Sequence, residues 1–311
     1  MSYDRMAPTA IRTFTMPDSG RRVRDQDDMA AQTETELIDL VDRWTAHMRW
    51  RKNYDRWRED RLWQEDNQYA RLRTIARHTK RMTGTRVLDI GSGMGGFLVA
   101  ARLSGMHAIG VEPSVDYCRI TRLRGMRYGM SPSVIRGVGE RLPCPDVSFD
   151  VVLAQDILEH VHDPDATMRE IRRVLAPNGV ALVTVINRLA WRDPHYHLFA
   201  INWLPRCIGE RIVERVGRSK RDARFSDNQR LGEMYYDTFA GFRRRARSLG
   251  FIVADTREAT LTEQPSAPSG KYAPIVRVLS RLRLVRPVYR LYRFAVASTF
   301  DLTLRRAGDS Q

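Results

Sequence analysis

The segment VLDIGSGMGGF, at 87–97, constrains this chain more than any other feature of its sequence. A short apolar run leads into a loop with four glycines, and an apolar helix pattern follows that loop. Glycine permits positive φ and close approach of a ligand to the backbone, and a helix that begins there directs free N–H groups at the ligand. The segment therefore predicts a nucleotide-like cofactor site at the end of a buried strand.

The spacing of the glycines leaves two cofactor classes open, because it also matches the G-x-G-x-x-G pattern of dinucleotide-binding folds. Asp89 favours a cationic ligand, since a pyrophosphate would gain nothing from an anion two residues before the first glycine. A second buried strand at 107–111 ends at Glu112, which is the place for a carboxylate that holds ribose hydroxyls. The alternative for Glu112 is an acidic residue that merely ends a strand.

The segment RGVGERLPCPDVSFDVVLAQDILEHVHDP, at 136–164, is the most specific part of the sequence. Together with the glycine loop, Glu112 and RVLAPNG at 173–179, it resembles the class I S-adenosylmethionine-dependent methyltransferases, in particular the group related to quinone-biosynthesis enzymes. The resemblance covers about 86–187 and implies S-adenosylmethionine as the cofactor. The expected cofactor-binding residues are Asp89, Gly91, Ser92, Gly93, Gly95, Glu112, Pro113, Gly139, Glu140 and Gln155.

The same resemblance assigns parts of the cofactor to parts of the chain. It implies that Asp89 and the first glycines surround the methionyl group, that Glu112 binds the ribose, and that Gly139 and Glu140 lie against the adenine. One position departs from the pattern, because Val138 stands where the family usually has an acidic residue that binds the adenine amino group. Adenine recognition is therefore expected to depend on backbone or neighbouring groups.

The alternation of buried strands with helices predicts an α/β fold, Rossmann-like and doubly wound, with a mostly parallel seven-stranded sheet. Ligands in such sheets bind beyond the carboxyl ends of the strands. The expected organisation is a disordered arm at 1–33, an N-terminal helical cap at 34–83, the methyltransferase domain at 84–260 with an insertion at 188–231, and a linker with a basic amphipathic helix at 261–311.

Composition predicts a cytoplasmic protein. No uncharged apolar run approaches the roughly twenty residues that span a bilayer, and the N-terminal region lacks the apolar core of a signal peptide. The three cysteines are isolated, which fits reduced thiols. The formal net charge of +15 lies mostly in the C-terminal part, and arginine supplies most of the positive charge. An anionic partner is one explanation of such a charge. The other is GC-rich coding, which by itself favours arginine.

The segment 271–306 interleaves basic with apolar residues and predicts an amphipathic helix. Arg286, Arg290 and Arg293 share one helical face, and apolar side chains fall largely on another. One interpretation is peripheral attachment to an anionic membrane surface, at the inner face, or a docking surface. The other is a helix that packs on the domain with its arginines in water.

Three histidines are the candidates for a catalytic base, namely His160, His195 and His197. Asp156, Glu159 and His160 have the spacing that places them on one face of a helix, and some quinone-type O-methyltransferases hold a divalent metal with such a set. The interpretation we favour is no metal, with Glu159 and His160 hydrogen-bonded to neighbouring loops.

The flanks of the domain are expected to shape the acceptor pocket. Trp50, Tyr54 and Trp57 form an aromatic stripe in the cap, which predicts packing against the core or, alternatively, ligand contact. The insertion at 188–231 is too apolar for a linker and is expected to cover the pocket. Its sequence DPHYHLF, followed by NWLP, resembles methyltransferases of glycan and surface-polysaccharide biosynthesis.

These observations favour methylation of oxygen, with nitrogen or carbon as alternatives, on a small-molecule, glycan or lipid-linked acceptor near a membrane surface. A prenylated quinone-like acceptor is the alternative within this class. A non-catalytic scaffold that binds S-adenosylmethionine is the alternative outside it. Nucleic acid is not expected as a partner, because the central domain is almost neutral and lacks a stacking motif. The sequence predicts neither the acceptor nor the oligomeric state.

Overall fold

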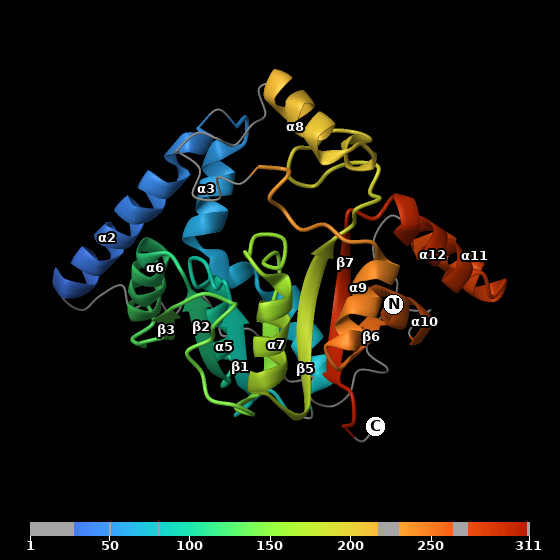
Figure 1. Ribbon diagram of the computed structural model, residues 1–311. Coiled ribbons are helices and arrows are strands. Elements are labelled where there is room, and N and C mark those ends of the chain that lie inside the picture. Colours follow the sequence, from blue (N-terminus) through green and yellow to red (C-terminus); the bar gives the residue numbers. More distant parts are fainter. Residues whose placement is uncertain (1–27, 50, 80, 217–229, 264–272, 310–311) are drawn as a thin grey trace. The chain divides into compact units, whose positions relative to one another are not determined.

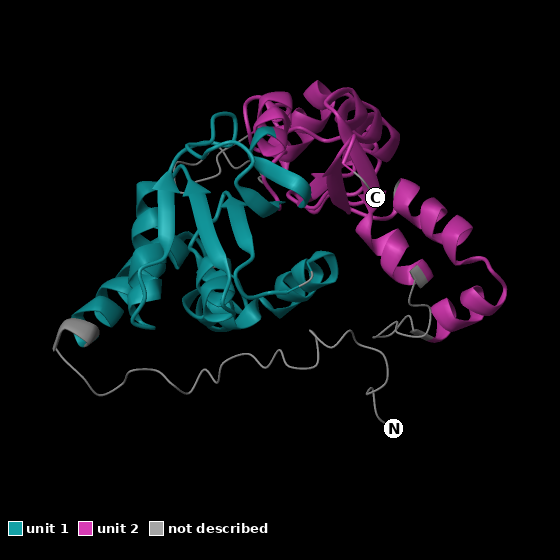
Figure 2. Ribbon diagram, turned by 90° about the horizontal axis from the view of Figure 1, so that it is seen from below, with its two compact units in different colours: residues 1–153, 173–180 teal, residues 154–172, 181–311 magenta. Residues whose placement is uncertain are grey.

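The computed structural model describes residues 28–49, 51–79, 81–216, 230–263 and 273–309 (Figure 1). The chain divides into two compact units (Figure 2). The first unit holds residues 1–153 and 173–180, and the second holds residues 154–172 and 181–311.

The described strands form a seven-stranded sheet in the order β3-β2-β1-β4-β5-β7-β6. Strand β1 pairs in parallel with β2 and β4, β2 pairs in parallel with β3, and β7 runs antiparallel to both β5 and β6. This order confirms the predicted doubly wound, mostly parallel sheet. The strands are β1 Arg86–Ile90, β2 His107–Glu112, β3 Ser133–Arg136, β4 Phe149–Ala154, β5 Leu175–Ile186, β6 Phe251–Asp255 and β7 Thr299–Arg306.

In the first unit, two helices connect neighbouring parallel strands. Helix α5 (Gly96–Leu103) joins β1 to β2, and α6 (Val115–Met126) joins β2 to β3. Because such crossovers are right-handed and both run in the same direction across the sheet, the two helices cover the same face. The apolar run that follows Arg86 in β1 is buried throughout, as expected of a central strand covered on both sides.

The N-terminal cap consists of α2 (Asp28–Thr45), η1 (Ala46–Met48), α3 (Tyr54–Leu62), η2 (Gln64–Asn67) and α4 (Tyr69–His78). Helix α2 lies along α6 (Figure 1), where Leu37 and Val41 pack with Ile120 in one buried cluster. The predicted arm at 1–33 is wrong for 28–33, which belong to α2, and its residues 1–27 lie outside the described ones.

Two aromatic residues of the cap that lie outside the predicted stripe pack against the core. Trp44 and Trp63 pack against the buried cluster between α2 and α6, and the Trp44 ring lies 4.7 Å from that of Tyr117. Tyr54 shares a hydrogen bond of 3.1 Å with Thr45 inside the cap. Trp50, a member of the predicted stripe, lies outside the described residues.

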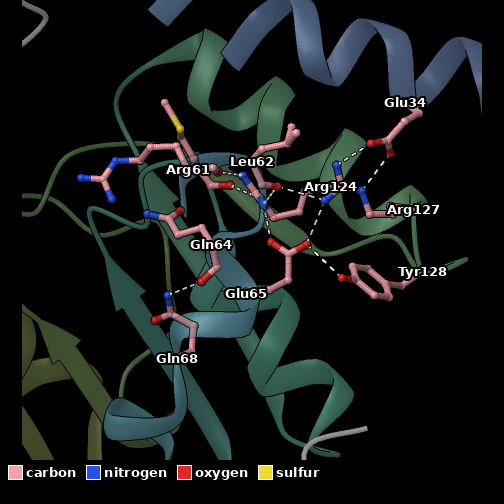
Figure 3. A network of polar contacts seen from close by, with 10 residues as sticks. Glu34, Arg61, Leu62, Gln64, Glu65, Gln68, Arg124, Arg127 and Tyr128 are labelled. Atoms are coloured by element: carbon pink, nitrogen blue, oxygen red, sulfur yellow. Dashed lines mark hydrogen bonds and ion pairs between the residues drawn. The ribbon is translucent and has the colours of Figure 1, made fainter. Parts of the chain in front are cut away.

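A buried polar network joins the cap to α6 (Figure 3). The side chains of Arg124 and Glu65 are 0% and 1% exposed and form an ion pair. Glu65 also accepts hydrogen bonds of 3.0 Å from Arg127 and from the Tyr128 hydroxyl. The Arg124 guanidinium donates further to the carbonyls of Arg61, Leu62 and Met94. The network thereby holds η2 against the start of α5, where a Cβ on Gly96 would lie 2.7 Å from Gln64 Cβ.

The second unit holds residues 154–172, which include most of α7 (Pro164–Val174), and resumes at residue 181 within β5. From there it continues through the insertion into β6 and β7. The insertion holds η3 (Ile201–Trp203) and α8 (Arg206–Arg215) and has a small apolar core of its own, with Tyr196, Ile201, Val213, Leu231 and Met234 buried together. Helix α9 (Phe239–Ser248) precedes β6, and α10 (Thr256–Glu263), α11 (Ala273–Arg281) and α12 (Val285–Ala295) follow it.

The C-terminal segment differs from the predicted basic helix in two ways. It forms two helices rather than one, and residues 299–306 form β7, so the sheet extends beyond the predicted limit of 84–260. In β7 the apolar residues Phe300, Leu302 and Leu304 are buried and recur at every second position, which is the period of a strand, and Thr303 between them is buried as well. The basic composition of the segment concealed this short alternation.

The arginines of α12 do not all face water. Arg293 is 9% exposed, and its guanidinium donates to Asp255 at 2.9 Å and to Glu258 at 3.0 Å. Arg290 donates to Glu258 at 2.9 Å. The predicted packing with every arginine in water is therefore wrong for Arg293. In the described part of the chain, no helix is long and apolar enough to cross a membrane.

Candidate functional site

The glycine loop between β1 and α5 has the conformation that its sequence predicts. Gly91, Gly93 and Gly95 have φ values of 67°, 55° and 76°, in the region that favours glycine. Gly95 precedes the first turn of α5, and a Cβ there would overlap the Thr121 side chain. A Cβ on Gly93, in contrast, would have no neighbour within 4 Å, so the loop is open at this point.

Asp89 lies near the carboxyl end of β1 and is 4% exposed. Burial raises the pKa of its carboxyl to about 7; the Arg71 guanidinium lowers that pKa, and Glu112 raises it. Within the described part of the chain, no hydrogen bond is found to this carboxylate. A ligand that brings a cation to Asp89 would therefore remove an electrostatic cost that the protein alone does not offset.

Glu112 ends β2 and holds the glycine loop in place. One carboxylate oxygen accepts a hydrogen bond of 2.9 Å from Gly93 N–H, and the other accepts one of 2.9 Å from Ser114 N–H. Burial raises the pKa of Glu112, and these two hydrogen bonds lower it. Because each carboxylate oxygen has a second lone pair, Glu112 can still accept hydrogen bonds from a diol.

The remaining cofactor candidates lie in three places. Ser92 is in the glycine loop, its hydroxyl oxygen buried without a hydrogen-bond partner, and Pro113 is exposed directly after β2. Gly139 and Glu140 form the turn between the bridged residues Val138 and Arg141. Gln155 follows β4 and belongs to the second unit, where its side-chain oxygen is buried without a hydrogen-bond partner.

A second cluster of polar side chains lies in the second unit, where Glu159, His160 and His195 come together. One oxygen of Glu159 lies 4.0 Å from His160 Nε2 and 3.8 Å from His195 Nε2. The two imidazole rings meet edge to face, with their centroids 5.2 Å apart. Glu159 is 1% exposed, and burial raises its pKa to about 8, with Asp156 adding to the rise. One ligand atom from each of the three residues fits within 4.8 Å of the others.

The local structure around this cluster corrects one prediction. Residues 156–160 form bends and turns rather than a helix, and Asp156 has a φ of 58°, so the set of Asp156, Glu159 and His160 on one helical face is wrong. His195 and His197 are separated: His195 joins the cluster, whereas His197 is exposed and is not among its members. These residues form the turn between β4 and α7, so their spacing does not have a helical meaning here.

His195 owes its position to the insertion. The Asp193 carboxylate accepts hydrogen bonds from the backbone N–H groups of His195, at 2.9 Å, and Tyr196, at 2.6 Å. The Tyr236 ring stacks on the His195 ring, with 6.1 Å between the two centroids. The Arg206 guanidinium lies over the same Tyr236 ring, 4.3 Å from its centroid. Sequence reasoning missed these supporting residues, as it missed Arg71 beside Asp89, because no local pattern marks them.

Asn187, which also follows a strand, has a structural role. Its amide donates to the carbonyls of Arg293, at 3.0 Å, and Ala297, at 2.8 Å, and its oxygen accepts from Leu189 N–H. Asn187 therefore holds the C-terminal end of α12 next to the end of β5 and does not contribute to either polar cluster.

Comparison with known proteins places these features in a family. A family model described as a methyltransferase domain matches residues 88–183. A ubiquinone biosynthesis O-methyltransferase of Chelativorans sp. is 29% identical over 214 residues, which cover 65% of this chain and 80% of that protein. Another, of Azorhizobium caulinodans, is 31% identical over 42% of this chain and 53% of its own length. The chain thus spans only about half of some relatives that it matches.

Two further proteins extend the likeness. An uncharacterized methyltransferase of Mycolicibacterium gilvum is 30% identical over 58% of this chain and 67% of that protein. The crystal structure of an S-adenosylmethionine-dependent methyltransferase from Mesorhizobium loti covers 77% of this chain and 97% of its own, with a TM-score of 0.50 and 16% identity, which shows a common fold. The chain belongs to the class I S-adenosylmethionine-dependent methyltransferases, and its cofactor is S-adenosylmethionine.

Proposed function

We propose that this protein methylates a hydroxyl oxygen of a small-molecule or lipid-linked acceptor. S-adenosylmethionine supplies an electrophilic methyl group on a sulfonium sulfur, so the protein has to align the acceptor and remove its proton. Alignment contributes as much as about 7–11 kcal/mol in ideal cases. The observation that supports an oxygen acceptor is the cluster of Glu159, His160 and His195, in which a buried carboxylate lies beside two imidazole groups.

In this proposal Asp89 and Glu112 hold the cofactor. The ionised Asp89 carboxylate pairs with the cationic methionyl end, and Glu112 accepts hydrogen bonds from the ribose hydroxyls. The turn at Gly139 and Glu140 takes the adenine through its backbone, because the side chain of Val138 is apolar and 48% exposed. Ser92, Pro113 and Gln155 remain candidates for further contacts.

Cofactor binding is expected to release a proton from Asp89. The free protein holds this carboxyl with a pKa of about 7, and pairing with a cation favours the ionised form. Affinity for S-adenosylmethionine should therefore rise as the pH increases through about 7, because less work is then needed to ionise Asp89. Calorimetry near pH 7 in two buffers of different ionisation enthalpy measures the released proton. Identical heats in both buffers would contradict this role of Asp89.

The second cluster supplies the base. When bound, S-adenosylmethionine would supply the methyl group, and His195 would take the proton that the acceptor hydroxyl loses. Burial raises the pKa of Glu159 to about 8, and in its ionised form this carboxylate stabilises the imidazolium. Glu159 follows β4 and His195 follows β5, and ligands of open parallel sheets bind beyond the carboxyl ends of such strands.

Replacing His195 by asparagine should lower kcat by about 10² to 10⁴, the usual contribution of a positioned base. Binding of S-adenosylmethionine should stay unchanged, because Asp89 and Glu112, which are proposed to hold it, belong to the other unit. His197→Asn is the matched control: this imidazole is two residues away, exposed and at a φ of 56°, which asparagine tolerates. Equal loss of activity in both variants would contradict the assignment.

A divalent metal is the alternative occupant of the cluster, because two imidazoles and a carboxylate suit such an ion. A metal would have to displace the Glu159 proton, so its affinity should increase with pH. Dialysis against a chelator, followed by addition of zinc or magnesium, distinguishes the two roles. Activity that is lost and then restored assigns a metal, whereas unchanged activity assigns the base.

Two acceptor classes remain within the proposal. The relatives named for ubiquinone biosynthesis favour a phenolic hydroxyl on a prenylated ring, and the wording of the insertion favours a glycan hydroxyl. Mass spectrometry of lipid and metabolite extracts incubated with the protein and labelled S-adenosylmethionine would identify the labelled product. Cofactor binding without any methylated product would support the scaffold alternative instead.

A further inference from the structure

Helix α12 is attached to the second unit by its polar face. Arg293 and the hydroxyl of Tyr289 both bond to the Asp255 carboxylate, and Arg290 and Arg293 bond to Glu258. The Asn187 amide holds the carbonyls at the end of the helix. These contacts fix which side of α12 faces outward.

The outward side is apolar. On α12 and the residue before it, Leu284, Val288, Leu291 and Phe294 are 43%, 42%, 72% and 62% exposed. Their spacing of three and four residues puts them on the side of the helix opposite Tyr289 and Arg293. A surface helix of a soluble domain ordinarily buries its apolar stripe and exposes its charges. Helix α12 instead exposes its apolar stripe and buries Arg293.

The neighbouring helix α11 also exposes apolar side chains. Ile275, Val278 and Leu282 are 56%, 54% and 60% exposed. The two helices contact each other (Figure 1). We use the term apolar face for these three residues together with Leu284, Val288, Leu291 and Phe294.

The charged side chains on these two helices and on the turn between them are all basic. Arg277, Arg281, Arg283 and Arg286 are exposed on the two helices and the turn between them. The sequence has no aspartate or glutamate between 271 and 300. Exposed apolar side chains bordered by arginine alone are the combination that binds the surface of an anionic bilayer, where the apolar groups enter the acyl boundary and the guanidinium groups bind phosphate.

We propose that the apolar face is a membrane-docking surface for anionic phospholipid. This inference is independent of the methyl acceptor, because it concerns α11 and α12 alone. The exposed arginines named above would bind the lipid phosphates, whereas the buried Arg293 fixes the orientation of α12.

Flotation of the full chain with vesicles tests the proposal. The unmodified protein should float with vesicles of equal phosphatidylcholine and phosphatidylglycerol, and it should stay behind with phosphatidylcholine alone. The triple variant Val288→Ser, Leu291→Ser, Phe294→Ser should lower the ratio of bound to free protein by at least about tenfold. The triple variant Arg281→Gln, Arg283→Gln, Arg286→Gln should lose the salt-sensitive part of the binding.

A control variant carries Met126→Ser and Ile252→Ser, which remove exposed apolar side chains, 55% and 46% exposed, from other elements. It should float like the unmodified protein, and every variant should still bind S-adenosylmethionine, which reports an intact fold. Failure of the unmodified protein to float, or undiminished flotation of the serine variant, would overturn the proposal. Dimerisation in sedimentation experiments that the serine variant abolishes would instead assign the face to a second copy of the chain.

Discussion

Asp89→Asn is expected to weaken the binding of S-adenosylmethionine by about thirty- to four-thousand-fold, the effect of about 2–5 kcal/mol for losing one partner of a buried charge pair. The substitution keeps the shape of the side chain and removes its charge. A Kd measured by calorimetry at pH 8, where the native carboxyl is largely ionised, gives the full effect.

The same variant should not destabilise the free protein. Because the pKa of Asp89 is raised in the folded state, its ionisation opposes folding increasingly between pH 3.8 and about 7 and by a constant amount above that range. Asparagine lacks this cost, so the urea midpoint at pH 8 should equal or exceed that of the unmodified protein. Asp116→Asn, on the exposed side of α6, is the control and should leave the Kd unchanged. Unaltered cofactor affinity in Asp89→Asn would refute the cationic site.

Glu65→Ala is expected to lower the free energy of unfolding by about 3–5 kcal/mol, the usual effect of removing one partner of a buried ion pair. Arg124 would keep its bonds to backbone carbonyls but would hold an uncompensated charge inside the protein, where its side chain is 0% exposed. Arg127 and Tyr128 would lose the same acceptor. Urea unfolding followed by tryptophan fluorescence measures the change.

Glu36→Ala provides the comparison for an ion pair in solvent. Glu36, on α2, pairs with Arg119 of α6 and so also joins the cap to α6, but the side chains are 37% and 62% exposed. The expected loss is below about 1 kcal/mol. If both variants lost a similar free energy of unfolding, the buried ion pair of Arg124 would stabilise the cap no more than a solvent-exposed one.

The sequence predicted the parts of the fold in which one local pattern has one physical meaning. The buried run before Asp89 is a central strand, and the positive φ of the loop glycines follows from the lack of a Cβ. The C-terminal strand escaped prediction because TFDLTLRR is short and lies in a segment whose arginines suggested a helix. Strand β7 depends on pairing with β5 and β6, which no local pattern reveals.

Some residues of the candidate sites were likewise predictable from a local sequence pattern, and others were not. Asp89 and Glu112 could be found because each lies at or next to the end of a strand, at a fixed distance from the glycines. His195 could not be distinguished from His197 by sequence, since the turn made by Asp193 determines which imidazole meets Glu159. The supporting side chains, such as Arg71 and Tyr236, come from distant segments and carry no signature of their own.

The order of strands has a consequence for how the second unit assembles. Strand β7 lies between β5 and β6, although both precede it in the chain. Until residues 299–306 leave the ribosome, the two earlier strands each present an open hydrogen-bonding edge and share no neighbour. Synthesis of this unit therefore passes through an interval in which chaperone binding or intermolecular strand pairing competes with completion of the sheet.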